Sequence, residues 1–141
     1  MPITTKHGSI FDSTAQVLVC PVNCVGVMGK GLALEFKKRF SYQSNEYMDY
    51  CQDGHMIPGR LFVYSSIWFA ATKDHWRDAS KLHWVEENLM WIAQYASEDG
   101  KSIAIPQLGC GCGGLDWADV WPLYEKHLGS LDCNVEVWIY E

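Results

Sequence analysis

Apolar and polar positions follow two spacings along the chain, and together they predict strands interleaved with helices. Residues 15–22 (AQVLVCPV) form a nearly continuous apolar run rich in valine, which is typical of a strand buried on both faces. Further short apolar runs, two of them separated near Ser65 and Ser66, predict strands over residues 59–66, 67–72, 101–108 and 134–140. A sheet with a strand buried on both faces needs helices on both sides.

The segments between these runs carry apolar residues every three or four positions, as amphipathic helices do. One helix is predicted to begin near Gly31 and to end in a basic turn that suits the negative end of the helix dipole, formed by Lys37, Lys38 and Arg39. A second helix is predicted over residues 44–54, where Ser44 can act as the N-cap and Gly54 as the stop.

Two further helical patterns complete the chain. Residues 82–96 predict a helix that ends at Gly100, and Asp116 can cap a last helix, which carries Val120, Tyr124 and Leu128. Strands and helices thus alternate, so we predict a single domain over residues 1–141 with an α/β fold, a three-layer α/β/α sandwich with a mixed central sheet. Ligands of such folds bind where loops leave the carboxyl ends of strands.

The composition fits one globular domain that binds small ligands rather than long polyanions. The chain has 141 residues, of which 48% are hydrophobic and 20% are charged. Its formal net charge of −6 argues against a general polyanion binder, because such affinity comes mainly from many Lys and Arg contacts to phosphates. A small anionic ligand is still compatible with this charge, since backbone amides bind anions through a local field.

The six cysteines predict reduced thiols rather than disulfides. The N-terminal segment MPITTKHGSIFD lacks the basic and then apolar pattern of a secretion signal, so we expect a cytoplasmic protein, and we expect a monomer. The spacing of Cys110 and Cys112 does not match common zinc modules, and we expect neither a metal nor a cofactor. No apolar run approaches the ~18 residues of a membrane span.

Two glycine-rich stretches each leave a predicted strand and enter a predicted helix: residues 22–36 (VNCVGVMGKGLALEF) and 106–117 (PQLGCGCGGLDW). Glycine removes the Cβ that would block a ligand, so successive backbone amides can turn toward one anion. Either stretch alone is compatible with a tight turn, but two at one sheet edge favour phosphate binding. Neither matches the P-loop or the G-x-G-x-x-G fingerprint, which disfavours a kinase-like or Rossmann assignment.

At these residues the chain resembles the macrodomain family of ADP-ribose-binding modules. The similarity rests on residues 22–40 (VNCVGVMGKGLALEFKKRF) and 105–120 (IPQLGCGCGGLDWADV), includes residues 71–89 (ATKDHWRDASKLHWVEENL) and covers nearly the whole chain. It is closest to the branch with the DarG-type DNA ADP-ribosyl glycohydrolases, the terminal ADP-ribose glycohydrolase and the yeast-type ADP-ribose 1″-phosphate phosphatases. The resemblance implies ADP-ribose or an ADP-ribosylated substrate as the ligand.

The resemblance also implies where the ligand contacts lie. The first loop would surround the distal ribose with Asn23, Gly29, Lys30 and Gly31, and an asparagine amide can both donate and accept hydrogen bonds to hydroxyls. The second loop would wrap the diphosphate with Leu108, Gly109, Cys110, Gly111, Cys112, Gly113, Gly114 and Leu115. Further implied contacts are Ser9, Ile10 and Thr72.

Lys73 is the implied catalytic residue, because the segment ATKDHWR (residues 71–77) matches the one that holds the catalytic lysine in the DarG-like branch. A lysine near the anomeric carbon can act as a nucleophile or as a fixed cation that stabilises a departing group. His75 is the second catalytic candidate, since histidine moves protons near neutral pH. The alternative is that His75 and Trp76 only anchor the strand-to-helix crossing.

Two residues depart from the family pattern. In the terminal glycohydrolases an aspartate helps to resolve a lysine-linked intermediate, but Gly113 stands at that position, which disfavours a covalent route. Ser9 stands where many macrodomains have an aspartate that accepts from the adenine amino group, and a neutral hydroxyl accepts more weakly. Cys110 and Cys112 are expected to pack as small hydrophobic side chains beneath the second loop.

The predicted function is the hydrolysis of ADP-ribosyl linkages, with removal of ADP-ribose from a nucleobase in DNA as the first hypothesis. A modified single strand would be held by local phosphate contacts at Lys30, Lys73 and Arg77. Two alternatives stay open: a non-catalytic module that binds ADP-ribose or a related nucleotide, and a phosphatase that acts on ADP-ribose 1″-phosphate.

Overall fold

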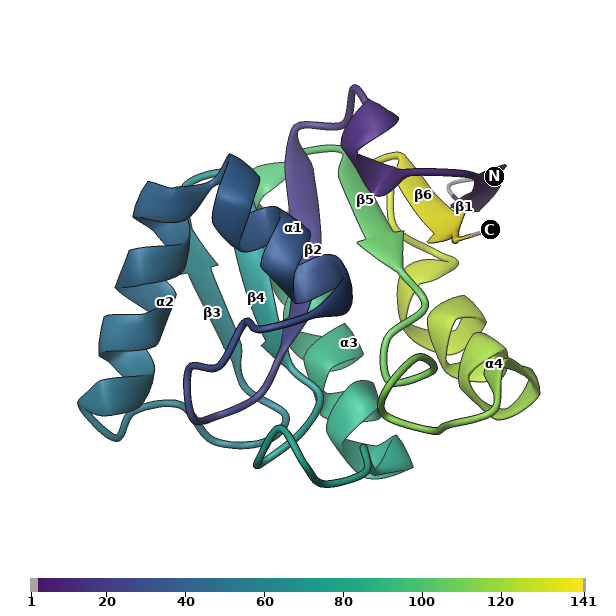
Figure 1. Cartoon of the computed structure of the whole chain (residues 1–141). Helices are drawn as coiled ribbons and strands as arrows, with labels where there is room; N and C mark the ends of the chain where they lie inside the picture. Colours follow the sequence, from purple (N-terminus) through teal and green to yellow (C-terminus); the bar gives the residue numbers. More distant parts are fainter. Residues whose placement is uncertain (1–2, 141) are drawn as a thin grey trace.

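The computed structural model describes residues 3–140, in which six strands form one sheet. In spatial order the strands are β1 (Ile3–His7), β6 (Val135–Ile139), β5 (Ile103–Pro106), β2 (Val17–Val22), β4 (Ile67–Ala71) and β3 (Leu61–Tyr64) (Figure 1). The β3 strand is antiparallel to β4, and the other neighbouring strands are parallel. The predicted mixed sheet is therefore confirmed.

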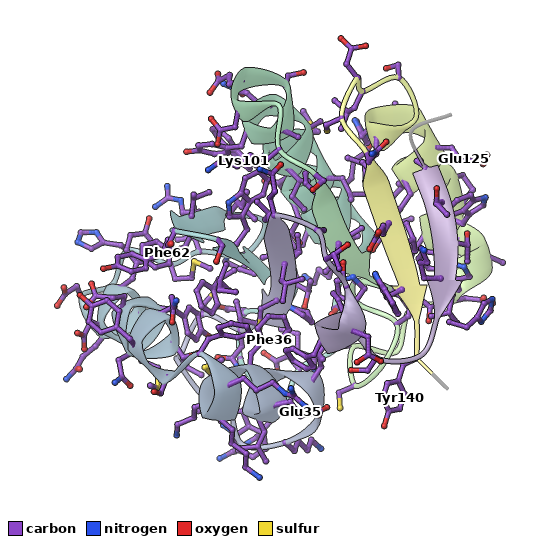
Figure 2. All side chains as sticks on the ribbon, turned by 90° about the horizontal axis from the view of Figure 1, so that it is seen from above. Glu35, Phe36, Phe62, Lys101, Glu125 and Tyr140 are labelled. Atoms are coloured by element: carbon purple, nitrogen blue, oxygen red, sulfur yellow. The ribbon has the colours of Figure 1, made fainter. Side chains whose placement is uncertain are left out.

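Helices cover both faces of the sheet, as predicted. Seen from above, α1 (Gly31–Arg39) and α2 (Ser41–Gln52) lie on one side of the sheet, and α3 (Leu82–Asp99) and α4 (Trp117–Leu128) lie on the other (Figure 2). A short 3-10 helix, η1 (Ile10–Asp12), connects β1 to β2. These layers form the predicted three-layer sandwich. In the described part of the chain, no helix has the length and apolar character to cross a membrane.

The central strand β2 packs against both helical layers. Val17 and Val19 belong to the buried cluster beneath α3 and α4, whereas Cys20 and Val22 belong to the cluster beneath α1 and α2. Side chains of a strand alternate between its two faces, so a strand between two helical layers is apolar at nearly every position. This packing is the physical reason for the continuous apolar run in the sequence.

The predicted helix stops and the cap of α4 are confirmed. Gly100 follows α3 in a left-handed conformation with φ of 67°, and Gly54 follows α2 with φ of 80°. The Asp116 side chain accepts a hydrogen bond of 3.0 Å from the Ala118 amide and thereby caps α4. These residues end or begin helices for local reasons that do not depend on the rest of the fold.

Two features of the fold differ from the sequence prediction. Ser44 is not an N-cap, because α2 begins at Ser41 and the Ser44 amide already donates to the Phe40 carbonyl. The chain passes from α1 to α2 through Phe40 alone, which leaves no room for a polar cap. The strand β1 was not predicted, because residues 4–7 are exposed at the sheet edge and carry no apolar pattern. Pairing with β6 holds this strand in the sheet.

The site is positioned by the separation of β2 from β5. These strands pair only at Val17 and Leu18, whereas β2 pairs with β4 as far as Val22. Pro21 has no amide hydrogen and so cannot extend the ladder as a donor. The chain leaves β2 toward α1 on one face and leaves β5 toward α4 on the other face. A crevice forms between neighbouring parallel strands at such a switch point.

Replacing the α4 cap tests how this helix is held. Asp116→Ala should lower the free energy of unfolding by about 1 kcal/mol, because it removes the acceptor for the Ala118 amide. Asp116→Asn is the matched control and should recover most of that loss, since asparagine caps about as well as aspartate. Chemical denaturation measures both, and an alanine variant as stable as the unaltered protein would contradict the assignment.

Candidate functional site

A cleft of about 770 Å³ opens at the edge of the sheet where β2, β4, β5 and β6 end. Its lining comes from the loop after β2, the first turn of α1, Gln107 and residues 109–113 after β5, Lys73 and Trp76 after β4, and Trp138 and Tyr140 at the end of β6. The volume falls within the range of roughly 300–1,000 Å³ that is usual for small-molecule sites. Both predicted glycine-rich loops therefore meet in one cleft.

The loop after β5 presents unpaired backbone donors. The Leu115 amide donates to Gly109 O over 2.9 Å, and the Gly114 amide donates to Gly111 O over 3.2 Å, so the loop is closed on itself. The Cys110 amide also has an acceptor, Gln107 O. Four other amides of this loop have no acceptor within residues 3–140: those of Gly109, Gly111, Cys112 and Gly113. Unpaired N–H groups in a glycine-rich loop are typical donors to an anion.

This second loop packs closely against Ser80, two residues before α3 begins. A Cβ on Gly113 would lie 2.5 Å from Gly109 O and 2.9 Å from Ser80 Cβ, with Ser80 Oγ closer still. The Ser80 amide donates to Gly113 O over 3.0 Å, which holds this contact in place. An aspartate does not fit at position 113 on this backbone, so the departure from the terminal glycohydrolases has a steric reason.

The loop after β2 is organised by the Asn23 side chain. Its Oδ1 accepts from the amides of Val25 (3.1 Å), Gly26 (3.0 Å) and Val27 (3.2 Å), and its Nδ2 donates to Val27 O (2.9 Å). The side chain lines the cleft, but Oδ1 is occupied and only one Nδ2 hydrogen remains for a ligand. In this structure Asn23 thus has a free donor for a ligand but no free acceptor, and its contact with a sugar stays a prediction.

Two buried tyrosine hydroxyls anchor the two loops. Tyr47 of α2 donates to Asn23 O over 2.6 Å, while Tyr124 of α4 donates to Pro106 O and accepts from the Leu108 amide over 2.9 Å. Burial raises the pKa of both hydroxyls, so both stay protonated donors. Neither anchor was predicted; the available signal was a tyrosine at a buried helix position, where its hydroxyl requires a partner.

The N-terminus of α1 supplies a second set of backbone donors. The Lys30 side chain makes no capping hydrogen bond, and Gly31 begins the helix with φ of 61°. Lys30, Gly31 and the next residues of the first turn line the cleft. The first amides of a helix have no acceptor within the helix, and they lie at the positive end of its dipole, so this end of α1 suits a negatively charged ligand.

The segment after β4 brings a cation to the cleft. Lys73 is partly buried, lines the cleft and donates from Nζ to Trp76 O over 3.3 Å. The segment is tied to the first loop, because the Cys24 amide donates to Asp74 O over 3.0 Å and Cys24 Sγ donates to Lys73 O over 3.3 Å. The His75 Nδ1 accepts from the Arg77 amide over 3.3 Å, and His75 is not part of the cleft lining.

The structure gathers most of the predicted contact residues, though not all of them. The predicted residues that line the cleft are Asn23, Gly29, Lys30, Gly31, Thr72, Lys73, Gly109, Cys110, Gly111, Cys112 and Gly113. Outside the lining are Ser9, Ile10, His75, Leu108, Gly114 and Leu115. Ser9 caps η1 by accepting from the Phe11 amide, Ile10 is buried in the core, and the Leu108 amide is bonded to Tyr124. Roles for these residues in ligand contact stay predictions.

The two cysteines of the second loop differ in environment. Cys110 packs partly against the core and donates from Sγ to Leu108 O over 3.6 Å, and burial, with a smaller effect of Asp116, raises the pKa of its thiol to about 11. Cys112 is exposed, so the expectation that it packs beneath the loop is wrong. In the described part of the chain, no three His, Cys, Asp or Glu side chains are placed to share a metal ion.

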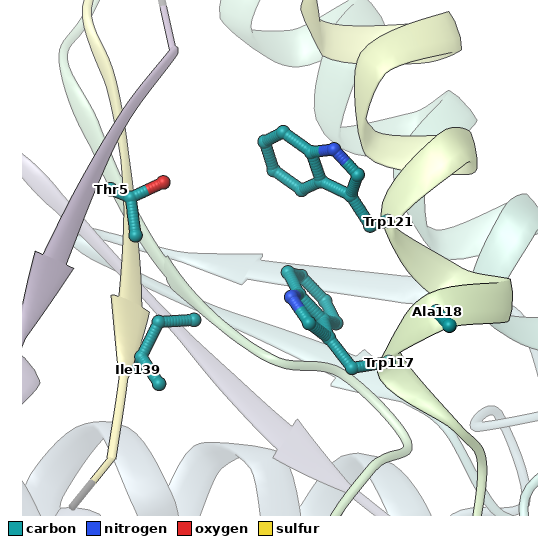
Figure 3. A pocket seen from close by; sticks show the side chains of 5 residues that line it. All are labelled: Thr5, Trp117, Ala118, Trp121 and Ile139. Carbon is teal, nitrogen blue, oxygen red and sulfur yellow. The ribbon is translucent and has the colours of Figure 1, made fainter.

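A second, smaller hollow of about 210 Å³ lies between the β1–β6 edge and α4 (Figure 3). Thr5, Trp117, Ala118, Trp121 and Ile139 line it. None of these side chains ionises at neutral pH, and the two indoles pack against each other at 5.7 Å between ring centroids. The hollow therefore lacks the groups that catalysis requires, and the large cleft is the candidate functional site.

Known proteins resemble this chain in sequence and in fold. The chain is 40% identical over 144 residues to a DNA ADP-ribosyl glycohydrolase of Thermus aquaticus, an alignment that covers 96% of this chain and 40% of that protein. The structure matches the macrodomain of Mycobacterium tuberculosis DarG with a TM-score of 0.92 at 35% identity, covering 96% of each chain. It matches Thermosipho africanus DarTG in complex with ADP-ribose with a TM-score of 0.87 at 31% identity, covering 96% of this chain and 41% of that one.

The chain thus spans about two fifths of the length of the Thermus aquaticus relative. The family model described as Macro domain matches residues 19–124, which include most of β2, both glycine-rich loops, Lys73 and Tyr124. The resemblance seen in the sequence is confirmed by this match and by the shared fold. The chain belongs to the Macro domain family.

Proposed function

We propose that this protein binds ADP-ribose in the large cleft and hydrolyses its linkage to a base in DNA. The observation that carries the proposal is the presence of unpaired backbone amides on two sides of one cleft, at the start of α1 and in residues 109–113. A diphosphate carries its charge on several oxygens and can accept from both sets at once. The names of the Thermus aquaticus relative and of the Thermosipho africanus complex support this ligand.

In the proposed complex, the diphosphate lies against these amides and the distal ribose points toward Lys73. The bond between the anomeric carbon and the base breaks, and its electron pair leaves with the base. Water supplies a hydroxyl to the anomeric carbon and a proton to the departing base. Since Gly113 leaves no room for an acid that would resolve a lysine-linked intermediate, we assign Lys73 the role of a fixed cation that stabilises the departing group.

We propose single-stranded DNA as the carrier of the modified base. The net charge of −6 disfavours a long phosphate footprint, so contacts would be limited to the nucleotides next to the cleft. Lys30 and Lys73 line the cleft, and Arg77 lies four residues beyond Lys73. These cations would offset the repulsion between the protein and the phosphates nearest to the modified base.

Removing the cation separates the proposed hydrolase from a module that only binds. Lys73→Ala should lower kcat for release of ADP-ribose from a modified single strand about 100-fold or more, because the departing group loses its stabilising charge. Calorimetry should find the affinity for free ADP-ribose within about threefold of the original, since the diphosphate contacts come from the backbone. Lys101→Ala, a change of an exposed lysine before β5, is the matched control. A Lys73→Ala variant that works at full rate would exclude this mechanism.

A substitution beneath the second loop tests the backbone site. Gly113→Ala should weaken the binding of free ADP-ribose at least about tenfold, because the new Cβ would overlap Gly109 O and Ser80, and the neighbouring amides must move. Gly54→Ala is the control, since it strains a left-handed residue after α2, away from the cleft lining. It should lower stability by about 1 kcal/mol and leave affinity unchanged. Undiminished binding by Gly113→Ala would contradict the site.

A further inference from the structure

Trp76 is a large aromatic side chain that remains exposed at the mouth of the cleft. It is 43% exposed and belongs to the cleft lining, whereas Trp91, at 44%, lies on α3 outside it. Scattered exposed aromatic residues need no explanation, but one that borders a ligand cleft offers apolar area where a ligand arrives. The mechanism proposed above does not use this ring.

The Trp76 ring belongs to a segment held by hydrogen bonds, in which Lys73 and Arg77 are basic and Asp74 and Asp78 are acidic. The Arg77 guanidinium lies 4.9 Å from the centroid of the indole, and the His75 ring lies 5.5 Å from it. The Asp78 amide donates to His75 O over 3.0 Å, so the turn that carries the ring is closed by a backbone hydrogen bond. The Lys73 Nζ donates to the backbone carbonyl Trp76 O over 3.3 Å, which ties the lysine assigned to the reaction to the main chain that carries the indole.

We infer that Trp76 stacks on the base next to the modified nucleotide of a single strand, while Arg77 faces a neighbouring phosphate. An aromatic face beside a guanidinium matches a nucleotide, which offers a planar base and an anionic phosphate a short distance apart. The chain lacks the positive charge for a long footprint, so one stacked base is the form of contact that its charge allows. A duplex would not expose that base, since both of its faces are already stacked.

This inference rests on the proposed function, because it assumes that the DNA strand attached to ADP-ribose extends out of the cleft at its Lys73 end. Under that function the base bonded to the distal ribose lies beside Lys73, and the flanking nucleotide must pass the residues that follow Lys73 in the chain. Trp76 thus determines substrate specificity: it favours a modified base within a strand over the same modified nucleoside alone. An ADP-ribosylated peptide has the same ADP-ribose but no flanking base to stack.

The test compares kcat/KM for two probes: a ten-nucleotide single strand with ADP-ribose on one base, and the same ADP-ribosylated nucleoside alone. For Trp76→Ala, the loss on the oligonucleotide should exceed the loss on the nucleoside about tenfold or more, because only the oligonucleotide has a base to stack. Trp76→Phe should recover most of the difference. Trp91→Ala, which changes an equally exposed indole outside the cleft lining, should give equal ratios for both probes.

The outcomes separate the two proposals. If the unaltered protein releases no ADP-ribose from either probe, the proposed function itself fails. If it releases ADP-ribose from both, and Trp76→Ala reduces both equally, the stacking inference is overturned while the proposed function stands. A larger loss by Trp76→Ala on an ADP-ribosylated peptide than on the oligonucleotide would also overturn it, in favour of a protein substrate.

Discussion

The architecture of the site depends on main-chain N–H groups that the fold leaves without partners. A buried amide without an acceptor costs free energy, so such groups persist only where a solvent-filled cleft or a ligand satisfies them. Here they lie at the start of α1 and in residues 109–113. The loops that carry both sets are held by side-chain hydrogen bonds, from Asn23 and Tyr47 at the first loop and from Tyr124 at the second. The loops are thus prepared before binding, which limits the entropy lost on association.

The sheet places these loops on the same cleft. Five parallel strands end at one edge, and β2 and β5 separate after two paired residues, so the space between their carboxyl ends stays open. Helices α1 and α4, which follow β2 and β5, lie on opposite faces of the sheet and therefore do not fill this space. The position of the cleft is therefore a property of the strand order, and it would survive many changes in the side chains that line it.

In the proposed function, the segment after β4 supplies the reacting cation and the aromatic contact to substrate. It carries Lys73 into the cleft and the Trp76–Arg77 pair to its mouth, and hydrogen bonds to Cys24 join it to the first loop. Of the four charged residues at positions 73–78 only Lys73 lines the cleft, and a nearby cation matters in a protein whose net charge is −6 because a small anion responds to nearby charges more than to distant ones. The close contact between Gly113 and Ser80 excludes an acid at position 113, and in the proposed function Lys73 supplies the positive charge at the reacting bond.

The sequence by itself determined the features that depend on neighbours along the chain. The buried strands, the Gly54 and Gly100 stops, the Asp116 cap and the two glycine-rich exits all follow from local spacing and backbone preference, and the family motifs are contiguous. Tertiary structure decided what depends on partners distant in sequence. The edge strand β1 is held by pairing with β6 rather than by apolar residues of its own, and α2 starts at Ser41 because α1 ends beside it.

The same division applies within the site. Glycine content indicated a backbone that could accept an anion, but only the fold showed which amides are free, because their competitors are hydroxyls and carbonyls elsewhere in the chain. The commitment of Asn23 Oδ1 to its own loop, the exposure of Cys112 and the contact of Ser80 with Gly113 could not be deduced from spacing. Each is a contact made in three dimensions, and composition and periodicity carry no information on which distant groups compete for one hydrogen bond or one space.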